Sequence, residues 1–150
     1  MKKIIALFFV TLLIFSCRND ETSNNSNNES SIIGKWSLQK VDVVMSSNSQ
    51  TQTTVNSDCN KKTIHEFSET HIISTFYGIV NKVCQLTGEV NSIKYTFDKP
   101  NMKFWYENEQ DYPYYIIKLT QNELIFEDRT QDRDGDNKPD ILRRYFTKIN

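Results

Sequence analysis

Apolar and polar residues alternate along most of the chain after residue 32. Residues 93–97, 102–104 and 115–119 show the alternation clearly, with a large apolar side chain at every second position. This period is typical of a β-strand with one face buried and the other in water. No stretch of ten residues in this region carries a helical stripe. The pattern predicts eight or nine short strands, at residues 36–45, 62–67, 71–77, 82–90, 93–97, 102–104, 115–119, 124–129 and 141–148.

Consecutive strands without crossover helices form antiparallel meanders, which close into a barrel or fold as a sandwich. We therefore expect an all-β fold with one domain at residues 32–150, a usual size for a single domain. The polar residues 46–58 form the longest predicted loop. Such a loop is either a flap over the mouth of a barrel or a mobile connector tied down at Cys59.

The first predicted strand changes the face that it buries. Trp36 and Leu38 share one face, whereas Val41 and Val43 share the other. One extra residue in a strand produces such a switch, so we predict a bend or bulge at residues 39–40.

The start of the chain has the features of an export signal. Lys2 and Lys3 precede an apolar run at residues 4–15, which is shorter than the roughly 20 residues that a membrane-spanning helix needs. Residues 14–17 resemble the bacterial lipobox, in which the cysteine becomes lipidated and is the first residue after cleavage. The resemblance implies an acylated Cys17 that anchors the protein to a membrane. The alternative is an ordinary secretory peptide with an incidental cysteine.

This interpretation divides the chain into three parts: a signal peptide at residues 1–16, a tether at residues 17–31 and the domain at 32–150. The tether is rich in Asn, Ser and Glu, so we expect it to be disordered. Asp20 and Glu21 resemble the surface-export signal of Bacteroidetes lipoproteins. We therefore expect an outer membrane lipoprotein on the periplasmic face or the cell surface.

Charge and cysteine content restrict the partners further. Removal of residues 1–16 leaves 16 basic against 19 acidic side chains, a net charge of −3. A nucleic-acid partner is not expected, because there is no basic surplus to neutralise phosphates. We also expect a monomer. With Cys17 lipidated, Cys59 and Cys84 remain as one possible disulfide, worth roughly 3 kcal/mol for this loop length. The spacing excludes a C-x-x-C redox motif, so a structural disulfide is the favoured interpretation. The minor alternative is a reactive thiol.

Several short motifs resemble the lipocalins. Gly34 and Trp36 form the G-x-W opening of the first strand. Residues 59–63, a second cysteine at Cys84 and the closing residues 145–148 follow in the order seen in lipocalin-like lipoproteins of Bacteroidetes. The resemblance implies an up-and-down β-barrel, with Trp36 packed across its closed end.

The same resemblance implies an arginine of the last strand over the Trp36 ring, and both Arg143 and Arg144 are candidates. It also implies a small hydrophobic ligand. An eight-stranded barrel is either filled by its own side chains or holds one small molecule. The two hypotheses are therefore a ligand-binding lipoprotein and a structural or protein-interaction module of the envelope with a filled core.

An acidic segment precedes the last strand. Asp132, Asp134, Asp136 and Asp140 occupy positions 1, 3, 5 and 9 of this segment, a spacing that suits calcium. It resembles the calcium loops of thrombospondin type 3 repeats. The twelfth position is Arg143 rather than the glutamate of an EF-hand, so a site here would be weak. The alternative is a solvated turn built from Asp, Asn, Gly and Pro.

Catalytic motifs are not apparent in the sequence. His65 and His71, with Glu66 nearby, lack a third ligand at a spacing that would indicate zinc. A nucleophile elbow and a phosphate-binding glycine loop are also missing. We therefore expect a protein that is not an enzyme and requires no cofactor, with calcium as a possible addition.

Overall fold

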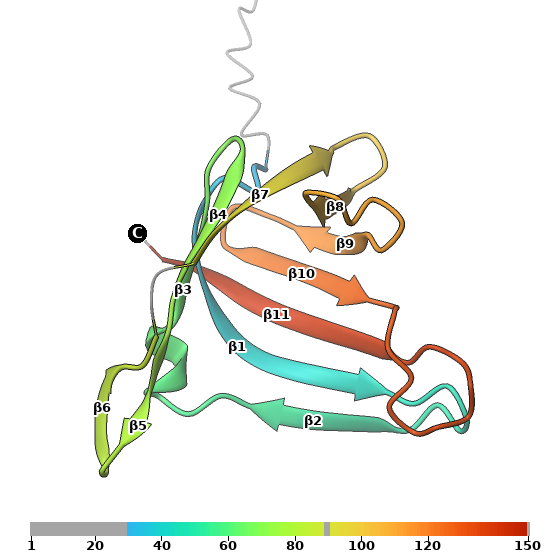
Figure 1. Ribbon diagram of the computed structural model, residues 1–150, viewed down its shortest axis with the longest axis horizontal. Helices are drawn as coiled ribbons and strands as arrows, with labels where there is room; N and C mark the ends of the chain where they lie inside the picture. The colour runs from blue at the N-terminus through green and yellow to red at the C-terminus, as the bar shows by residue number, and fades with distance from the viewer. Residues whose placement is uncertain (1–29, 89–90, 150) are drawn as a thin grey trace, which may run out of the picture.

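The computed structural model describes residues 30–88 and 91–149, and most of this part of the chain forms one closed β-barrel (Figure 1). Neighbouring strands are antiparallel, and the last strand pairs with the first along its whole length, which closes the barrel. The barrel strands are β1 (Gly34–Val44), β3 (Ile64–Phe67), β4 (His71–Thr75), β7 (Asn91–Asp98), β8 (Lys103–Tyr106), β9 (Tyr114–Leu119), β10 (Glu123–Asp128) and β11 (Ile141–Ile149). The prediction of an all-β antiparallel meander that closes into a barrel is confirmed.

Three further strands lie outside the closed barrel: β2 (Thr51–Val55), β5 (Tyr77–Val80) and β6 (Val83–Leu86). β5 and β6 form a separate hairpin, and Figure 1 shows it far from the end where the described chain begins. The single helical element of residues 30–88 and 91–149 is the 3-10 turn η1 (Asn60–Lys62). In this part of the chain no helix is long and apolar enough to cross a membrane.

The prediction of a long loop at residues 46–58 was wrong, because β2 occupies its middle. All five residues of β2 are exposed, and they pair with the second half of β1. β2 has no buried face and therefore no alternation of apolar and polar residues. Other predicted boundaries also differ. η1 precedes β3, and the predicted strand at residues 71–77 ends at Thr75, after which Tyr77 begins β5. The predicted strand at residues 82–90 is shorter, because β6 ends at Leu86.

The predicted irregularity in the first strand is confirmed. The register between β1 and β11 shifts between Leu38 and Lys40. Before this bulge, Gly34 to Ser37 pair with β3; beyond it, Lys40 to Val44 pair with β2. The wall between β1 and β3 therefore ends at the bulge, and the barrel opens on that side.

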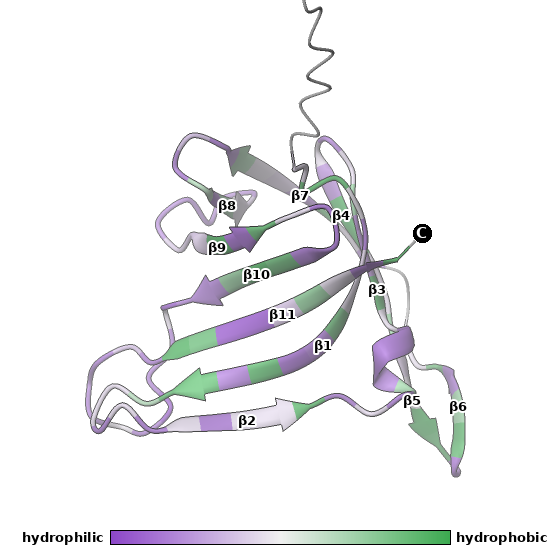
Figure 2. Ribbon diagram, turned by 180° about the vertical axis from the view of Figure 1, so that it is seen from behind, coloured by the Kyte–Doolittle hydropathy of each residue, from purple (hydrophilic) through white to green (hydrophobic). Residues whose placement is uncertain are grey.

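The core lies on the inward faces of the strands. Figure 2 shows hydrophobic and hydrophilic segments following one another along β1 and β11, as expected for half-buried strands. Trp36, Phe104 and Leu124 are completely buried. The buried core comprises Ile32, Trp36, Phe67, Ile72, Tyr95, Phe104, Ile116, Leu124, Phe126 and Phe146.

A candidate ligand cavity inside the barrel

A cavity of about 150 Å³ lies inside the barrel. Seven of the eight barrel strands contribute to its wall, and most of the side chains are aliphatic or aromatic. An apolar cavity of about this size in an engineered protein holds one benzene molecule. The lining residues are Leu38, His65, Phe67, Ile72, Tyr106, Tyr114, Phe126, Arg144 and Phe146.

Arg144 lines this cavity because of its position in β11. Leu142 and Phe146, two residues away on either side, are 6% and 4% exposed, so this face of β11 points into the barrel. Side chains of a strand alternate between its faces, which places Arg144 on the inward face as well. A cation therefore stands among aromatic side chains.

Aromatic rings surround the arginine. Phe126 and Phe146 stack with their ring centroids 5.1 Å apart, and Tyr114 stacks on Phe104 at 5.0 Å. The guanidinium carbon of Arg144 lies 5.7 Å from the ring centroid of Phe126 and 5.8 Å from that of Tyr114. These cation–π contacts stabilise the charge while leaving the N–H groups available.

The polar contacts of Arg144 are few. Its Nη2 lies 3.8 Å from Oδ2 of the buried Asp128, an ion pair too long for a hydrogen bond. Oδ1 of Asp128 accepts hydrogen bonds from the backbone N–H and the hydroxyl of Thr130. Nη1 of Arg144 is buried, and no hydrogen-bond partner for it is found among the described residues. A buried N–H without a partner costs about 1–3 kcal/mol, so this atom is unusual.

The other titratable groups of the cavity are neutral at physiological pH. Burial, helped by the charge of Arg144, lowers the pKa of His65 to about 4, and its Nδ1 lies 2.8 Å from Ser74 Oγ. Burial raises the pKa of Tyr114 to about 12 and also raises the pKa of Tyr106. Both phenols are therefore protonated and can donate hydrogen bonds.

The opposite end of the barrel is closed around Trp36. Its indole Nε1 donates a hydrogen bond of 2.7 Å to the backbone carbonyl of Ile32. Lys148 Nζ lies 5.2 Å from the Trp36 ring centroid and donates to the carbonyl of Ile33. Gly34 has φ +135°, and a Cβ there would lie 2.6 Å from Cε of Lys148. The glycine of the G-x-W motif thus leaves room for the lysine that covers the tryptophan.

The expectation that Arg143 or Arg144 covers Trp36 was wrong. Trp36 pairs in register with Lys148, four residues beyond Arg144, so the lysine is the cation within reach. Arg143 lies on the outer face and donates two hydrogen bonds to Oε1 of the buried Glu127, at 2.6 and 2.8 Å. Arg144 points into the cavity instead.

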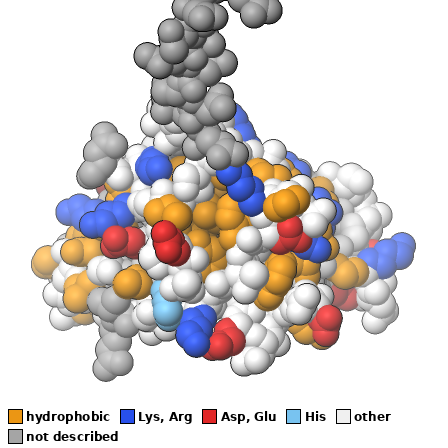
Figure 3. All heavy atoms as spheres, turned by 90° about the horizontal axis from the view of Figure 1, so that it is seen from above, with side chains coloured by type: hydrophobic (Ala, Val, Ile, Leu, Met, Phe, Trp, Pro, Cys, Tyr) orange, Lys and Arg blue, Asp and Glu red, His pale blue; other side chains and the backbone are white. Residues whose placement is uncertain are grey.

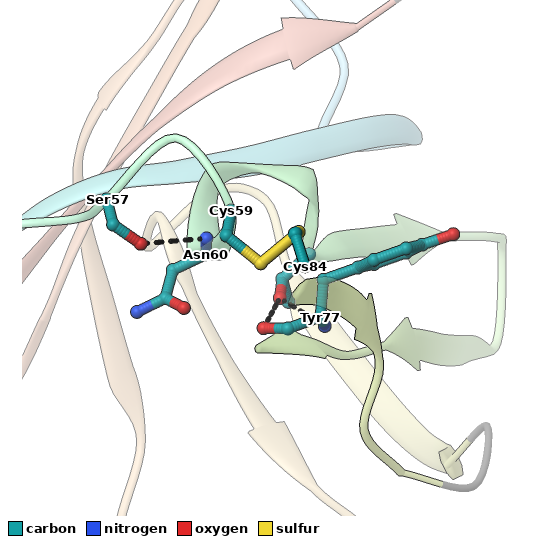
Figure 4. Close-up of a disulfide and its surroundings, with 6 residues drawn as sticks. Ser57, Cys59, Asn60, Tyr77 and Cys84 are labelled. Atoms are coloured by element: carbon teal, nitrogen blue, oxygen red, sulfur yellow. Dashed lines mark hydrogen bonds between the residues drawn. A yellow bond between two sulfur atoms is a disulfide. The ribbon is translucent and has the colours of Figure 1, made fainter. Parts of the chain in front are cut away.

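Cys59 and Cys84 form a disulfide with a Cα–Cα distance of 5.5 Å (Figure 4). It joins the residue before η1 to β6 and thereby holds the β5–β6 hairpin against the body of the domain. Figure 4 shows Tyr77 beside this link, where its backbone N–H donates to the hydroxyl of Thr63 at 2.9 Å. The predicted role as a structural staple agrees with this position.

The acidic segment brings three of its four predicted calcium ligands together. Carboxylate oxygens of Asp132, Asp134 and Asp136 lie within 4.8 Å of one another. Asp140 is not part of this group: it is 2% exposed, and its two oxygens accept from the backbone N–H groups of Ser46 and Arg133. Asp140 therefore ties this segment to the β1–β2 turn, and calcium binding by the other three stays a prediction.

The two histidines do not form a metal site. His65 of β3 pairs with Ser74 of β4, whereas His71 of β4 pairs with Lys94 of β7. His65 faces the cavity with Phe67, whereas His71 belongs to the opposite face of β4 from the buried Ile72. Of the described part of the chain, the acidic trio alone gathers three candidate metal ligands.

A larger hollow of about 470 Å³ lies on the outer surface, at the end where the described chain begins. Figure 3 looks onto this end and shows hydrophobic side chains gathered near the middle of the face. The hollow is lined by residues 30–33 together with Glu69, Tyr95, Thr96, Phe97 and Lys99. It is more open to solvent than the cavity inside the barrel.

A closed eight-stranded meander with an interior cavity is the architecture of small up-and-down barrels. The family model "Lipocalin-like domain" matches residues 18–126, and the chain belongs to this family. The match ends in β10, before β11. The crystal structure of aphrodisin, a sex pheromone from female hamster, is similar with a TM-score of 0.41 and 14% identity, over 80% of this chain and 76% of that chain. No match was found among curated proteins.

Sequence reasoning identified the barrel and its tryptophan but missed the lining of the cavity. The signal for Arg144 was present, because the order Leu142, Arg144, Phe146 places a charge at an inward position of the last strand. His65 stands in the same relation to Phe67. A polar residue within an alternating apolar set thus marks a candidate cavity residue.

Proposed function

We propose that the protein is a cell-envelope lipoprotein whose barrel binds a small hydrophobic molecule. The cavity of about 150 Å³ inside the barrel is the observation that carries this proposal. A core filled by its own side chains, as a purely structural module would have, leaves no such space. Membership of the lipocalin-like family supports the same conclusion.

A binding role fits the chemistry of the cavity better than catalysis does. His65 is neutral and bonded to Ser74, and Arg144 carries a permanent charge, so neither is placed as a general acid or base at neutral pH. The remaining wall is mainly aliphatic and aromatic. The proposed role is therefore that of a carrier or receptor. The proposal includes a monomer and no nucleic-acid partner.

Native mass spectrometry tests the binding function. The chain from residue 17 onward, with Cys17→Ser and the disulfide formed, is incubated with envelope lipid extract and then weighed. We expect a reproducible added mass of one small molecule. Leu38→Trp, which fills the cavity, should abolish the added mass, whereas Ile117→Trp at an exposed position should retain it. A bare mass from the folded Cys17→Ser chain without a further substitution would reject the function.

The anchoring proposal rests on the lipobox at residues 14–17, which lies outside the described residues together with the predicted signal peptide and Cys17. The domain would be held at the outer membrane, on its periplasmic face or at the cell surface, by lipid on Cys17. Replacement of Cys17 by Ser should move the full chain from the membrane to the soluble fraction. Retention in the membrane fraction would contradict the anchor.

A further inference from the structure

We infer that the barrel recognises a small neutral molecule that carries a carbonyl oxygen, and that Arg144 holds this oxygen. The inference rests on the proposed binding function and adds the chemical class of the ligand. It starts from the buried Nη1 of Arg144, for which the described residues provide no acceptor. An oxygen of the ligand would supply the hydrogen bond that the folded protein does not.

Two phenols at the cavity offer hydrogen-bond donors in addition to Arg144. The phenols of Tyr106 and Tyr114 line the cavity and are protonated at neutral pH. Their ring centroids lie 5.4 Å apart, with Tyr114 also next to the Arg144 guanidinium. Because the arginine only donates, whereas a phenol both donates and accepts, a ligand group that accepts can bond to all three side chains.

The charges at the mouth favour a neutral acceptor over an anion. Asp128 already offsets the charge of Arg144 at 3.8 Å. A groove that shares Tyr114 with the cavity is lined by Asp128 and Glu109, and the charges of both raise the pKa of Tyr114. A carboxylate ligand would add a third negative charge to this partly buried site, whereas a carbonyl group adds none.

The size of the cavity limits the rest of the ligand. A volume of about 150 Å³ accepts roughly one six-membered ring. The stacked rings of Phe126 and Phe146 line the apolar part, and Arg144 lies on the same strand as Phe146. A single ring with a carbonyl substituent therefore matches both the volume and the position of the donor.

The test compares two probes of similar shape, acetophenone and ethylbenzene, which differ by the carbonyl oxygen. Binding of each is measured by ligand-observed NMR or calorimetry to the Cys17→Ser chain and to the same chain with Arg144→Met. We expect Arg144→Met to weaken acetophenone binding at least tenfold more than ethylbenzene binding. Comparing the loss for each probe removes the difference in their hydration. Arg133→Met, which removes an exposed arginine outside the cavity, should leave both affinities unchanged.

Benzoate is the anionic probe, and it should bind the unsubstituted cavity more weakly than acetophenone. Equal loss of acetophenone and ethylbenzene in Arg144→Met would overturn the role of Arg144 while leaving the proposed binding function intact. Tighter binding of benzoate would overturn the neutral class of ligand. Failure of all three probes to bind the folded chain would overturn this inference, while the lipid-extract measurement would still judge the binding function separately.

Loss of Arg144 leaves Asp128 without its ion pair, which could destabilise the barrel. The double variant Arg144→Met with Asp128→Asn removes both charges and replaces Arg144→Met if that variant unfolds. The same tenfold selective loss of acetophenone is expected. An unchanged ratio of the two affinities in the double variant would refute the inference.

Discussion

The two ends of the barrel differ in how their polar side chains are bonded. At the closed end, the indole N–H of Trp36 and the ammonium of Lys148 both bond to backbone carbonyls of the segment that precedes β1. In the cavity half, Nη1 of Arg144 has no partner among the described residues. One end is therefore fully bonded and packed, whereas the other holds an unpartnered donor beside a cavity, as the proposed binding function requires.

The largest expected effect follows from truncating Trp36, the buried side chain at the closed end of the barrel. Trp36→Ala should destabilise the domain by about 3–5 kcal/mol, because Trp36 is completely buried and its removal leaves a large cavity. Urea unfolding followed by circular dichroism measures the change. Trp105→Ala on β8 is the control: its neighbour Phe104 takes the buried position, so Trp105 faces outward. Similar losses of unfolding free energy for both variants would contradict the role of Trp36 as the buried side chain that closes this end.

The cavity half should respond to acid through His65. Its pKa is 6.5 in the unfolded chain and about 4 in the folded one, so the unfolded state gains a proton first as the pH falls. Stability should therefore fall between pH 6.5 and pH 4, by up to about 3 kcal/mol. His65→Gln should remove this part of the pH dependence in urea titrations, whereas His71→Gln should retain it. A profile that is the same in wild type and His65→Gln would refute the shift.

The disulfide stabilises the region of η1 and the β5–β6 hairpin, away from the closed end. Replacement of both Cys59 and Cys84 by Ser should lower the free energy of unfolding by roughly 3 kcal/mol. Reduction of the wild-type protein should have the same effect and serves as the control. Thiol titration of the unreduced chain carrying Cys17→Ser should find no free thiol. Two reactive thiols in that chain would contradict the pairing.

Gly34, the glycine of the G-x-W motif, should also contribute to the stability of the closed end. Gly34→Ala should cost about 1–3 kcal/mol, because alanine rarely adopts this φ and its Cβ would meet Lys148. Gly135→Ala is the comparison, since Gly135 has a φ of +78° and no atom within 4 Å of the added Cβ. Thermal unfolding should show the larger loss at Gly34. Equal losses would mean that neither the φ of +135° nor the contact with Lys148 adds to the cost at Gly34.

The smallest expected effect concerns calcium. If Asp132, Asp134 and Asp136 bind it with a dissociation constant of about 1 mM, 10 mM calcium should stabilise the domain by about 1.4 kcal/mol. A rise of a few degrees in melting temperature would measure this, and Asp134→Asn should reduce it. An unchanged melting temperature in 10 mM calcium would dispose of the site.

The alternation of residues in the sequence predicts which face of each strand is buried, and hence the barrel, the bulge after Leu38 and the burial of Trp36. It does not predict β2, whose polar residues are all exposed. Nor does it show whether inward side chains meet across the barrel. The cavity beside Arg144 depends on the distances between seven strands, which local patterns do not contain.

The pairing of β1 with β11 has a consequence for how the chain folds. Trp36 pairs with Lys148, so the first barrel strand meets a partner that lies far from it along the chain. Contacts between such distant segments require the closure of a long loop and slow the search for the native state. Until β11 arrives, one edge of β1 has unpaired backbone groups that invite wrong strands or other chains. The pairing of β11 with β1 is therefore the step that ends this vulnerable period of folding.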